Sequence, residues 1–85
     1  MLTLLPINEK VKDKIRKYSL QKKFDKQIKF LTNNPQHPSL NVELLEPKIH
    51  GIHSFRIDKK YRALFIFRPD LEAIEILTIT VHYQN

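Results

Sequence analysis

The chain has 85 residues, of which 41% are hydrophobic, and a formal net charge of +6. It contains no cysteine, which excludes disulfide bridges and zinc–thiolate sites and fits a reducing cytoplasm. No apolar run approaches the roughly 18 residues that cross a membrane. We therefore expect one small cytoplasmic domain over residues 1–85, with no membrane partner.

The excess positive charge is concentrated in the first third of the chain. Residues 1–30 hold nine lysines and arginines against three acidic residues, whereas residues 31–85 hold six of each. A basic surface suggests an anionic partner such as nucleic acid or the ribosome. The competing interpretation is the solvated face of lysine-rich helices, which are common.

Two short amphipathic helices are predicted near the N-terminus. Asn8 is a suitable N-cap for the first, with Glu9 in its first turn, and Ser19 is a candidate cap for the second. The apolar stripes are Val11, Ile15 and Tyr18 in the first helix and Leu20, Phe24, Ile28 and Leu31 in the second. Asn33-Asn34-Pro35 ends the second helix. The pattern predicts a helical hairpin with a basic outer surface.

The remaining elements are predicted strands. Residues 2–5 and 42–45 are short candidates, and residues 54–67 form a β-hairpin because apolar and polar side chains alternate along them. Residues 73–83 form the last strand. Helices followed by strands predict an α+β fold, in which the N-terminal helical hairpin packs on one face of a three- to four-stranded antiparallel sheet.

The last predicted strand changes its apolar side partway along. Ile74 and Ile76 occupy even positions, whereas Leu77, Ile79 and Val81 occupy odd ones. The change indicates either a strand that is buried on both faces at its middle or a β-bulge.

The register of the hairpin decides whether two arginines meet. A three-residue loop, Asp58 to Lys60, places Arg56 opposite Arg62, whereas a two-residue loop places them on opposite faces. Like charges that face each other cost stability. The pair is therefore either two solvated surface arginines or a site for a phosphate group.

The residues that could carry chemistry are Glu43, Arg56, Arg62, His82 and Tyr83, on three predicted neighbouring strands. Such a set suits cleavage of RNA without a metal ion: a base deprotonates the 2′-hydroxyl, guanidinium groups stabilise the phosphate, and an acid protonates the leaving oxygen. Each also has a structural alternative, as a solvated glutamate, an exposed histidine or a packed tyrosine.

Metal binding has little support in the sequence. His50 and His53 are three residues apart but lack a nearby carboxylate pair, so we expect no metal site and no cofactor. His37, in a proline-rich loop, is expected to be exposed or to pack that turn rather than to form a site.

Several short motifs resemble the RelE/ParE superfamily of bacterial toxins, the toxin halves of type II toxin–antitoxin pairs. They are His37-Pro38-Ser39-Leu40, the pair Leu44-Leu45, Ser54-Phe55-Arg56-Ile57, Tyr61-Arg62-Ala63-Leu64-Phe65 and the closing His82-Tyr83. The resemblance covers roughly residues 8–85 and is closest to the YoeB/RelE-like branch of mRNA interferases. It implies an endoribonuclease that cuts mRNA on the ribosome and inhibits translation.

The resemblance also implies roles for individual residues. Glu43 matches the general base, with Glu46 as a rival. Arg62 matches the arginine that stabilises the phosphate, His82 the general acid, and Tyr83 the residue that places or stacks the substrate. Arg56 is the first arginine of the sheet.

The expected partners follow from the same resemblance. They are a cognate antitoxin, mRNA and the RNA of the ribosome, and we expect Lys48, Lys59 and Lys60 to bind nucleic acid. The superfamily also contains toxins that inhibit DNA gyrase without enzymatic activity, and the motifs of residues 37–65 do not discriminate between the two. A simple RNA- or protein-binding domain is a third alternative.

Overall fold

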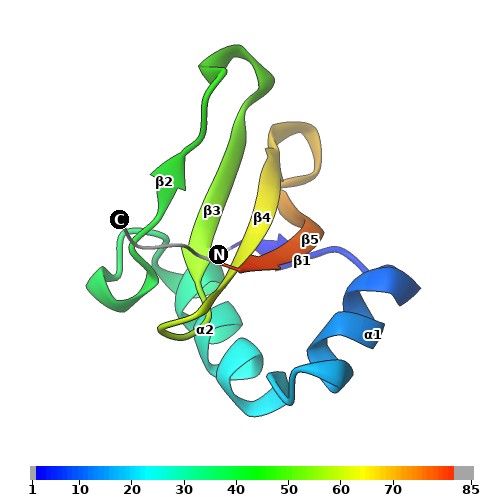
Figure 1. Cartoon of the computed structure of the whole chain (residues 1–85). Helices are drawn as coiled ribbons and strands as arrows, with labels where there is room; N and C mark the ends of the chain where they lie inside the picture. The colour runs from blue at the N-terminus through cyan, green and yellow to red at the C-terminus, as the bar shows by residue number, and fades with distance from the viewer. Residues whose placement is uncertain (1, 82–85) are drawn as a thin grey trace.

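Two helices pack on a five-stranded sheet in the computed structural model, which describes residues 2–81 (Figure 1). In chain order the elements are β1 (Thr3–Leu4), α1 (Glu9–Lys17), α2 (Gln21–Asn33), β2 (Glu43–Leu44), β3 (Ile52–Arg56), β4 (Tyr61–Arg68) and β5 (Ala73–Val81). The 3₁₀ turns η1 (Pro38–Leu40), η2 (Lys48–His50) and η3 (Pro69–Leu71) connect them. The strand order is β1-β5-β4-β3-β2. The predicted α+β class is therefore confirmed.

The sheet differs from the prediction in two respects: it is mixed, and it has five strands. β1 pairs in parallel with β5, through Thr3 opposite Ala73 and Leu4 opposite Ile74. The Leu5 N–H still donates to the Ile74 carbonyl at 2.9 Å, but Pro6 has no N–H with which to extend the ladder. β1 is therefore short, and most of the outer edge of β5 lies beyond it.

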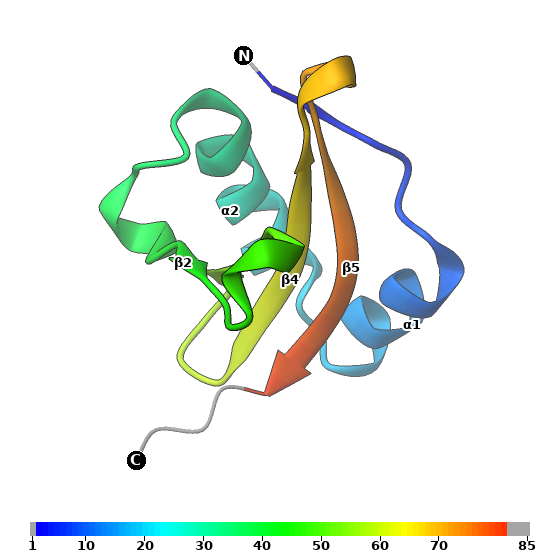
Figure 2. The ribbon, with the colours of Figure 1, turned by 90° about the horizontal axis from the view of Figure 1, so that it is seen from above.

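The helix α1 covers that edge. It packs beside β5 (Figure 2), and the Lys14 ammonium donates to the Ile79 carbonyl and to the Thr78 hydroxyl, both at 3.1 Å. Covering a strand edge with a helix, and occupying one of its carbonyls with a lysine, opposes pairing with another chain.

Asn8 caps α1 as predicted, but the role predicted for Ser19 is wrong. The Asn8 Oδ1 accepts from the Val11 N–H at 2.9 Å. Ser19 has a φ of 55° and ends α1 rather than starting α2. Its N–H donates to the Arg16 carbonyl and the Leu20 N–H to the Ile15 carbonyl, which is a Schellman motif. In this motif Ile15 and Leu20 are both buried in the core, and Ser19 forms the turn between the helices instead of capping α2.

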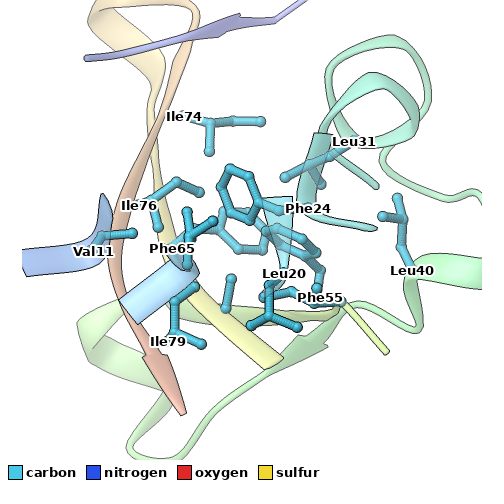
Figure 3. Close-up of a cluster of buried hydrophobic side chains, with 13 residues drawn as sticks. Val11, Leu20, Phe24, Leu31, Leu40, Phe55, Phe65, Ile74, Ile76 and Ile79 are labelled. Atoms are coloured by element: carbon cyan, nitrogen blue, oxygen red, sulfur yellow. The ribbon is translucent and has the colours of Figure 1, made fainter. Parts of the chain in front are cut away.

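The core lies between the helices and one face of the sheet (Figure 3). Phe55 and Phe65 come from β3 and β4, and their ring centroids are 5.7 Å apart; Phe24 from α2 is 6.2 Å from Phe55. All three are at most 2% exposed. Because side chains alternate along a strand, Ser54, next to Phe55, and Arg62, three positions before Phe65, lie on the other face, which we call the pocket face.

A β-bulge explains the change of apolar side in β5. Leu64 pairs with Thr78 but Phe65 pairs with Ile76, so Leu77 is the extra residue. Ile76 and Ile79 are consequently both buried in the core. Of the two predicted explanations, the bulge is correct, and it places Thr80 opposite Arg62 on the pocket face.

The hairpin has the three-residue loop that brings the arginines together. The Ile57 N–H donates to the Tyr61 carbonyl at 3.0 Å, and Arg56 pairs with Arg62. The Asp58 Oδ1 accepts from the N–H groups of Lys60 and Tyr61, both at 2.8 Å, which fixes the loop.

The Gln27 side chain of α2 supports the loop end of the hairpin from the core side. It is 6% exposed, and its Nε2 donates to the Arg56 carbonyl at 2.7 Å and to the Ser39 carbonyl at 3.1 Å. One amide therefore joins α2, the end of β3 and η1.

Replacing Gln27 by alanine should destabilise the fold by about 1–3 kcal/mol, because two carbonyls lose their donor. The free energy of unfolding in urea measures this loss. The matched control is Gln21→Ala, whose exposed amide bonds only Asp25. Equal losses for the two variants would contradict the bracing role.

Asp58 should make stability depend on pH. Burial alone raises the pKa of this carboxyl, but the N–H groups of Tyr61 and Lys60 and the ammonium of Lys23 outweigh it, so the pKa lies below its ordinary value of 3.8. The resulting stabilisation is present above the ordinary value and is lost as pH falls through the folded pKa.

Urea titrations between pH 7 and pH 2 should therefore show a shallower loss of stability in Asp58→Asn than in the wild type. The control is Asp70→Asn, an exposed carboxylate 4.0 Å from the Arg68 Nε, whose surface ion pair contributes little. Identical pH profiles for the wild type and Asp58→Asn would contradict the prediction.

Candidate functional site

A small pocket opens on the pocket face of the sheet, where β2, β3, β4 and β5 lie side by side. Its volume is about 140 Å³. Its lining residues are Glu43, Leu45, Ser54, Arg62, Leu64, Thr80 and Val81. All but the aliphatic ones carry a polar group that could contact a ligand.

Arg62 is the one cationic residue among those that line this pocket. Its side chain is held by three acceptors: Nε donates to the Ser54 Oγ at 3.0 Å, and Nη2 donates to the Asn41 carbonyl at 2.5 Å and to the Ser54 carbonyl at 3.4 Å. The residue is only 4% exposed. Nη1 is buried and has no hydrogen-bond partner within residues 2–81. Buried polar groups normally have partners, so an orphaned guanidinium nitrogen indicates a place for a ligand acceptor.

The charges around Arg62 act on it in opposite directions. Burial lowers the pKa of Arg62, Glu43 acts in the opposite direction, and the like charge of Arg56 lowers it further. Arginine stays protonated even so. Glu43 lines the pocket but forms no ion pair with Arg62 in the part of the chain described. A buried cation without a carboxylate partner is costly until an anion arrives.

Three of the predicted site residues come together. Glu43 and Arg62 line the pocket, and Arg56 pairs with Arg62 on the neighbouring strand. Glu46 is exposed and is not among the lining residues. His82 and Tyr83 lie outside the described residues.

The three predicted nucleic-acid-binding lysines do not form one cluster. Lys48 belongs to η2, before β3, whereas Lys59 and Lys60 lie in the loop after it. All three are exposed, and the Lys60 Nζ lies 5.5 Å from the centre of the Tyr61 ring. They therefore occupy opposite ends of a strand.

Sequence reasoning missed Ser54 and Asn41, which position Arg62. Ser54 had a detectable signal: with Arg56 opposite Arg62, a small polar residue two positions before Arg56 lies diagonal to the arginine. Asn41 contributes only its backbone carbonyl, from a left-handed conformation with φ of 44°, and no side-chain pattern reveals such a contact.

The histidines have structural contacts. His37 stacks on Phe30 with ring centroids 3.8 Å apart, and its Nδ1 accepts from the Ser39 N–H, so its predicted packing role in the turn is confirmed. The His53 ring packs against Phe67. Within residues 2–81, no three side chains of histidine, aspartate or glutamate are placed to hold a metal ion. No helix in this range is long and apolar enough to span a membrane.

Phosphate should stabilise the folded protein through Arg62. An anion present at ten times its Kd adds about 1.4 kcal/mol, and for a domain of this size each kcal/mol corresponds to a rise in Tm of about 4–8 °C. Thermal unfolding in inorganic phosphate, against chloride of equal ionic strength, measures this shift. Arg62→Met should lose it.

The control for that measurement is Arg68→Met. Arg68 lies on the same strand, but its charge is paired with Glu75 at 2.8 Å. It should keep the phosphate shift. Equal shifts in the wild type and Arg62→Met would show that phosphate acts elsewhere on the molecule.

Comparison with known proteins identifies the architecture. No family model and no curated protein matches the chain. Among solved structures, it is similar to a YoeB/ParE toxin from Agrobacterium tumefaciens, with a TM-score of 0.74, 17% identity, and coverage of 96% of this chain and 100% of that one.

Two further solved structures agree with that likeness. A chain of a YoeB–YefM complex from Staphylococcus aureus gives a TM-score of 0.71 at 18% identity, and the match covers 98% of this chain and 99% of that one. A metal-bound toxin from Helicobacter pylori gives a TM-score of 0.73 at 16% identity, and the match covers 96% of each chain. The chain therefore has the fold of the YoeB/ParE toxins.

Proposed function

We propose that this protein is the toxin of a type II toxin–antitoxin pair and that it inhibits translation by cutting mRNA on the ribosome. The observation that carries the proposal is the buried Arg62, whose free guanidinium nitrogen has no partner within residues 2–81 and which shares a pocket with Glu43. The fold of the YoeB/ParE toxins supports the same conclusion.

Arg62 binds the phosphate that is cleaved. Its Nε and Nη2 are occupied by protein acceptors, which leaves Nη1 for a non-bridging phosphate oxygen. Nε and Nη2 hold the side chain in place, so Nη1 stabilises the charge that grows on the phosphate once the oxygen reaches it. Arg56, on the adjacent strand, adds positive charge beside it.

Glu43 and His82 move the protons. Glu43 accepts the proton of the 2′-hydroxyl as its oxygen bonds to phosphorus, the bond from phosphorus to the 5′-oxygen breaks, and His82 donates a proton to that oxygen. The products are a 2′,3′-cyclic phosphate and a 5′-hydroxyl, and no metal ion takes part. Tyr83 stacks on a neighbouring base. Glu43 is preferred to Glu46 as the base because it lines the pocket.

The basic surface of the two helices supports binding to ribosomal RNA. Their exposed cations include Lys10, Lys12, Arg16, Lys17, Lys22 and Lys29. Contacts to phosphates through such side chains weaken steeply as salt rises. Such a protein acts in the cytoplasm. It also needs a cognate antitoxin, as the YoeB–YefM complexes among the similar structures suggest.

Cleavage should depend on Arg62 and His82. We expect Arg62→Ala to reduce cleavage of ribosome-bound mRNA about 10²–10³-fold, and Glu43→Gln or His82→Ala to reduce it about 10²–10⁴-fold. Mapping of mRNA 5′ ends after induction measures the cuts, and the control Arg68→Ala should cut normally.

Two results would overturn the proposal. One is intact mRNA on ribosomes incubated with wild-type protein. The other is inhibition of DNA gyrase in a supercoiling assay that persists in His82→Ala, which would reassign the chain to the non-enzymatic toxins.

A further inference from the structure

A second and larger hollow lies between α2 and the loop that joins β3 to β4, and we call it the basic groove. Its volume is about 360 Å³. Its lining residues are Lys23, Lys26, Gln27, Ser39, Arg56, Ile57, Asp58 and Lys59. Neither the proposed chemistry nor the fold alone accounts for four cationic residues around one hollow.

Most of this positive charge is not neutralised. Asp58 is the only carboxylate in the lining, and its Oδ1 is occupied by the backbone N–H groups of Lys60 and Tyr61. Its Oδ2 bonds the Lys23 Nζ at 3.3 Å. Lys26, Arg56 and Lys59 form no ion pair with any carboxylate among residues 2–81. The groove therefore keeps three uncompensated cations.

Hydrogen bonds join the two walls that carry these cations. The buried Gln27 amide joins α2 to the end of β3, and Asp58 fixes the loop. Lys26 on the helix and Lys59 on the loop are thus attached to walls whose separation does not depend on a ligand. Fixed charges bind without the cost of ordering the backbone.

The basic groove adjoins the pocket of Arg62. Arg56 lines the groove, and across the β3–β4 ladder it pairs with Arg62, which lines the pocket. A strand of nucleic acid with one phosphate at Arg62 therefore passes Arg56 before it reaches the groove.

We propose that the basic groove binds the phosphodiester backbone of the same single-stranded RNA whose scissile phosphate lies at Arg62, through Lys26, Arg56 and Lys59. This inference rests on the proposed function. A cationic groove that follows the backbone is typical of single-strand binding. A protein segment would instead need apolar anchors, and the only aliphatic lining residue, Ile57, is 4% exposed.

The test uses a short single-stranded RNA in which a 2′-deoxynucleotide prevents cleavage. The variant is Lys26→Gln with Lys59→Gln. The matched control is Lys22→Gln with Lys29→Gln, which removes the same charge from exposed positions of α2 that do not line the groove.

We expect the groove variant to raise the Kd about tenfold and to reduce the slope of log K against log salt by about 1.4, since each phosphate contact on a single strand contributes about 0.7. The control should change the Kd less than about twofold. Equal effects of the two double variants would overturn the proposal, because only total charge would then matter.

Two further experiments test whether the groove binds ribosomal RNA or an acidic protein segment instead of the RNA substrate. If the groove variant binds the short RNA normally but loses binding to ribosomes, the groove contacts ribosomal RNA and the proposal is wrong. If poly-glutamate at equal charge displaces the RNA from wild type but not from the groove variant, the groove belongs to an acidic protein segment, which also overturns it.

The outcomes separate the groove from the cleavage chemistry. Wild-type protein that binds RNA through the groove but leaves ribosome-bound mRNA intact would refute the proposed function and not the groove. Normal cleavage by wild type, with unchanged RNA affinity and salt dependence in the groove variant, would refute the groove alone.

Discussion

The register of the β3–β4 hairpin is the constraint on which the rest of the structure depends. Because side chains alternate with a period of two, a slip of one residue would exchange the core face and the pocket face. The three-residue loop, closed by the Asp58 carboxylate, prevents that slip. Phe55 and Phe65 then reach the core, and Arg62 reaches the pocket with Ser54 as its partner.

The helices support this register from the core side. The Schellman motif at Ser19 turns the chain so that α2 follows α1 directly, and Leu20 enters the core. The Gln27 amide then bonds the carbonyl of Arg56, the residue where β3 ends. Helix packing and strand register are therefore linked by the buried Gln27 amide, and the Lys23–Asp58 ion pair adds a second contact between α2 and the hairpin.

Much of the fold follows from the sequence because its signals are local. The Asn8 cap, the apolar stripes and the alternation in the hairpin each depend on residues close together in the chain, and the meeting of Arg56 and Arg62 required only the loop length. The parallel pairing of β1 could not be predicted, because it joins segments some seventy residues apart through backbone groups.

The candidate site likewise has features that the sequence predicts and features that appear only in the folded structure. The sequence predicted roles for Glu43 and Arg62, whose side chains carry recognisable chemistry and which line the same pocket. It did not reveal the Asn41 carbonyl, because every residue has one, nor the basic groove, whose walls meet only after α2 packs against the hairpin. At Ser19 the local preference for a cap was overridden by the apolar contact between Ile15 and Leu20.

The contact of Lys14 in α1 with the edge of β5 affects how copies of the protein can assemble. Lys14 occupies the Ile79 carbonyl on the part of the edge that β1 leaves open, within residues 2–81. A second copy that tried to extend the sheet there would have to displace an ammonium group and bury it without a counter-ion. Fibrous stacking through this edge is thereby disfavoured.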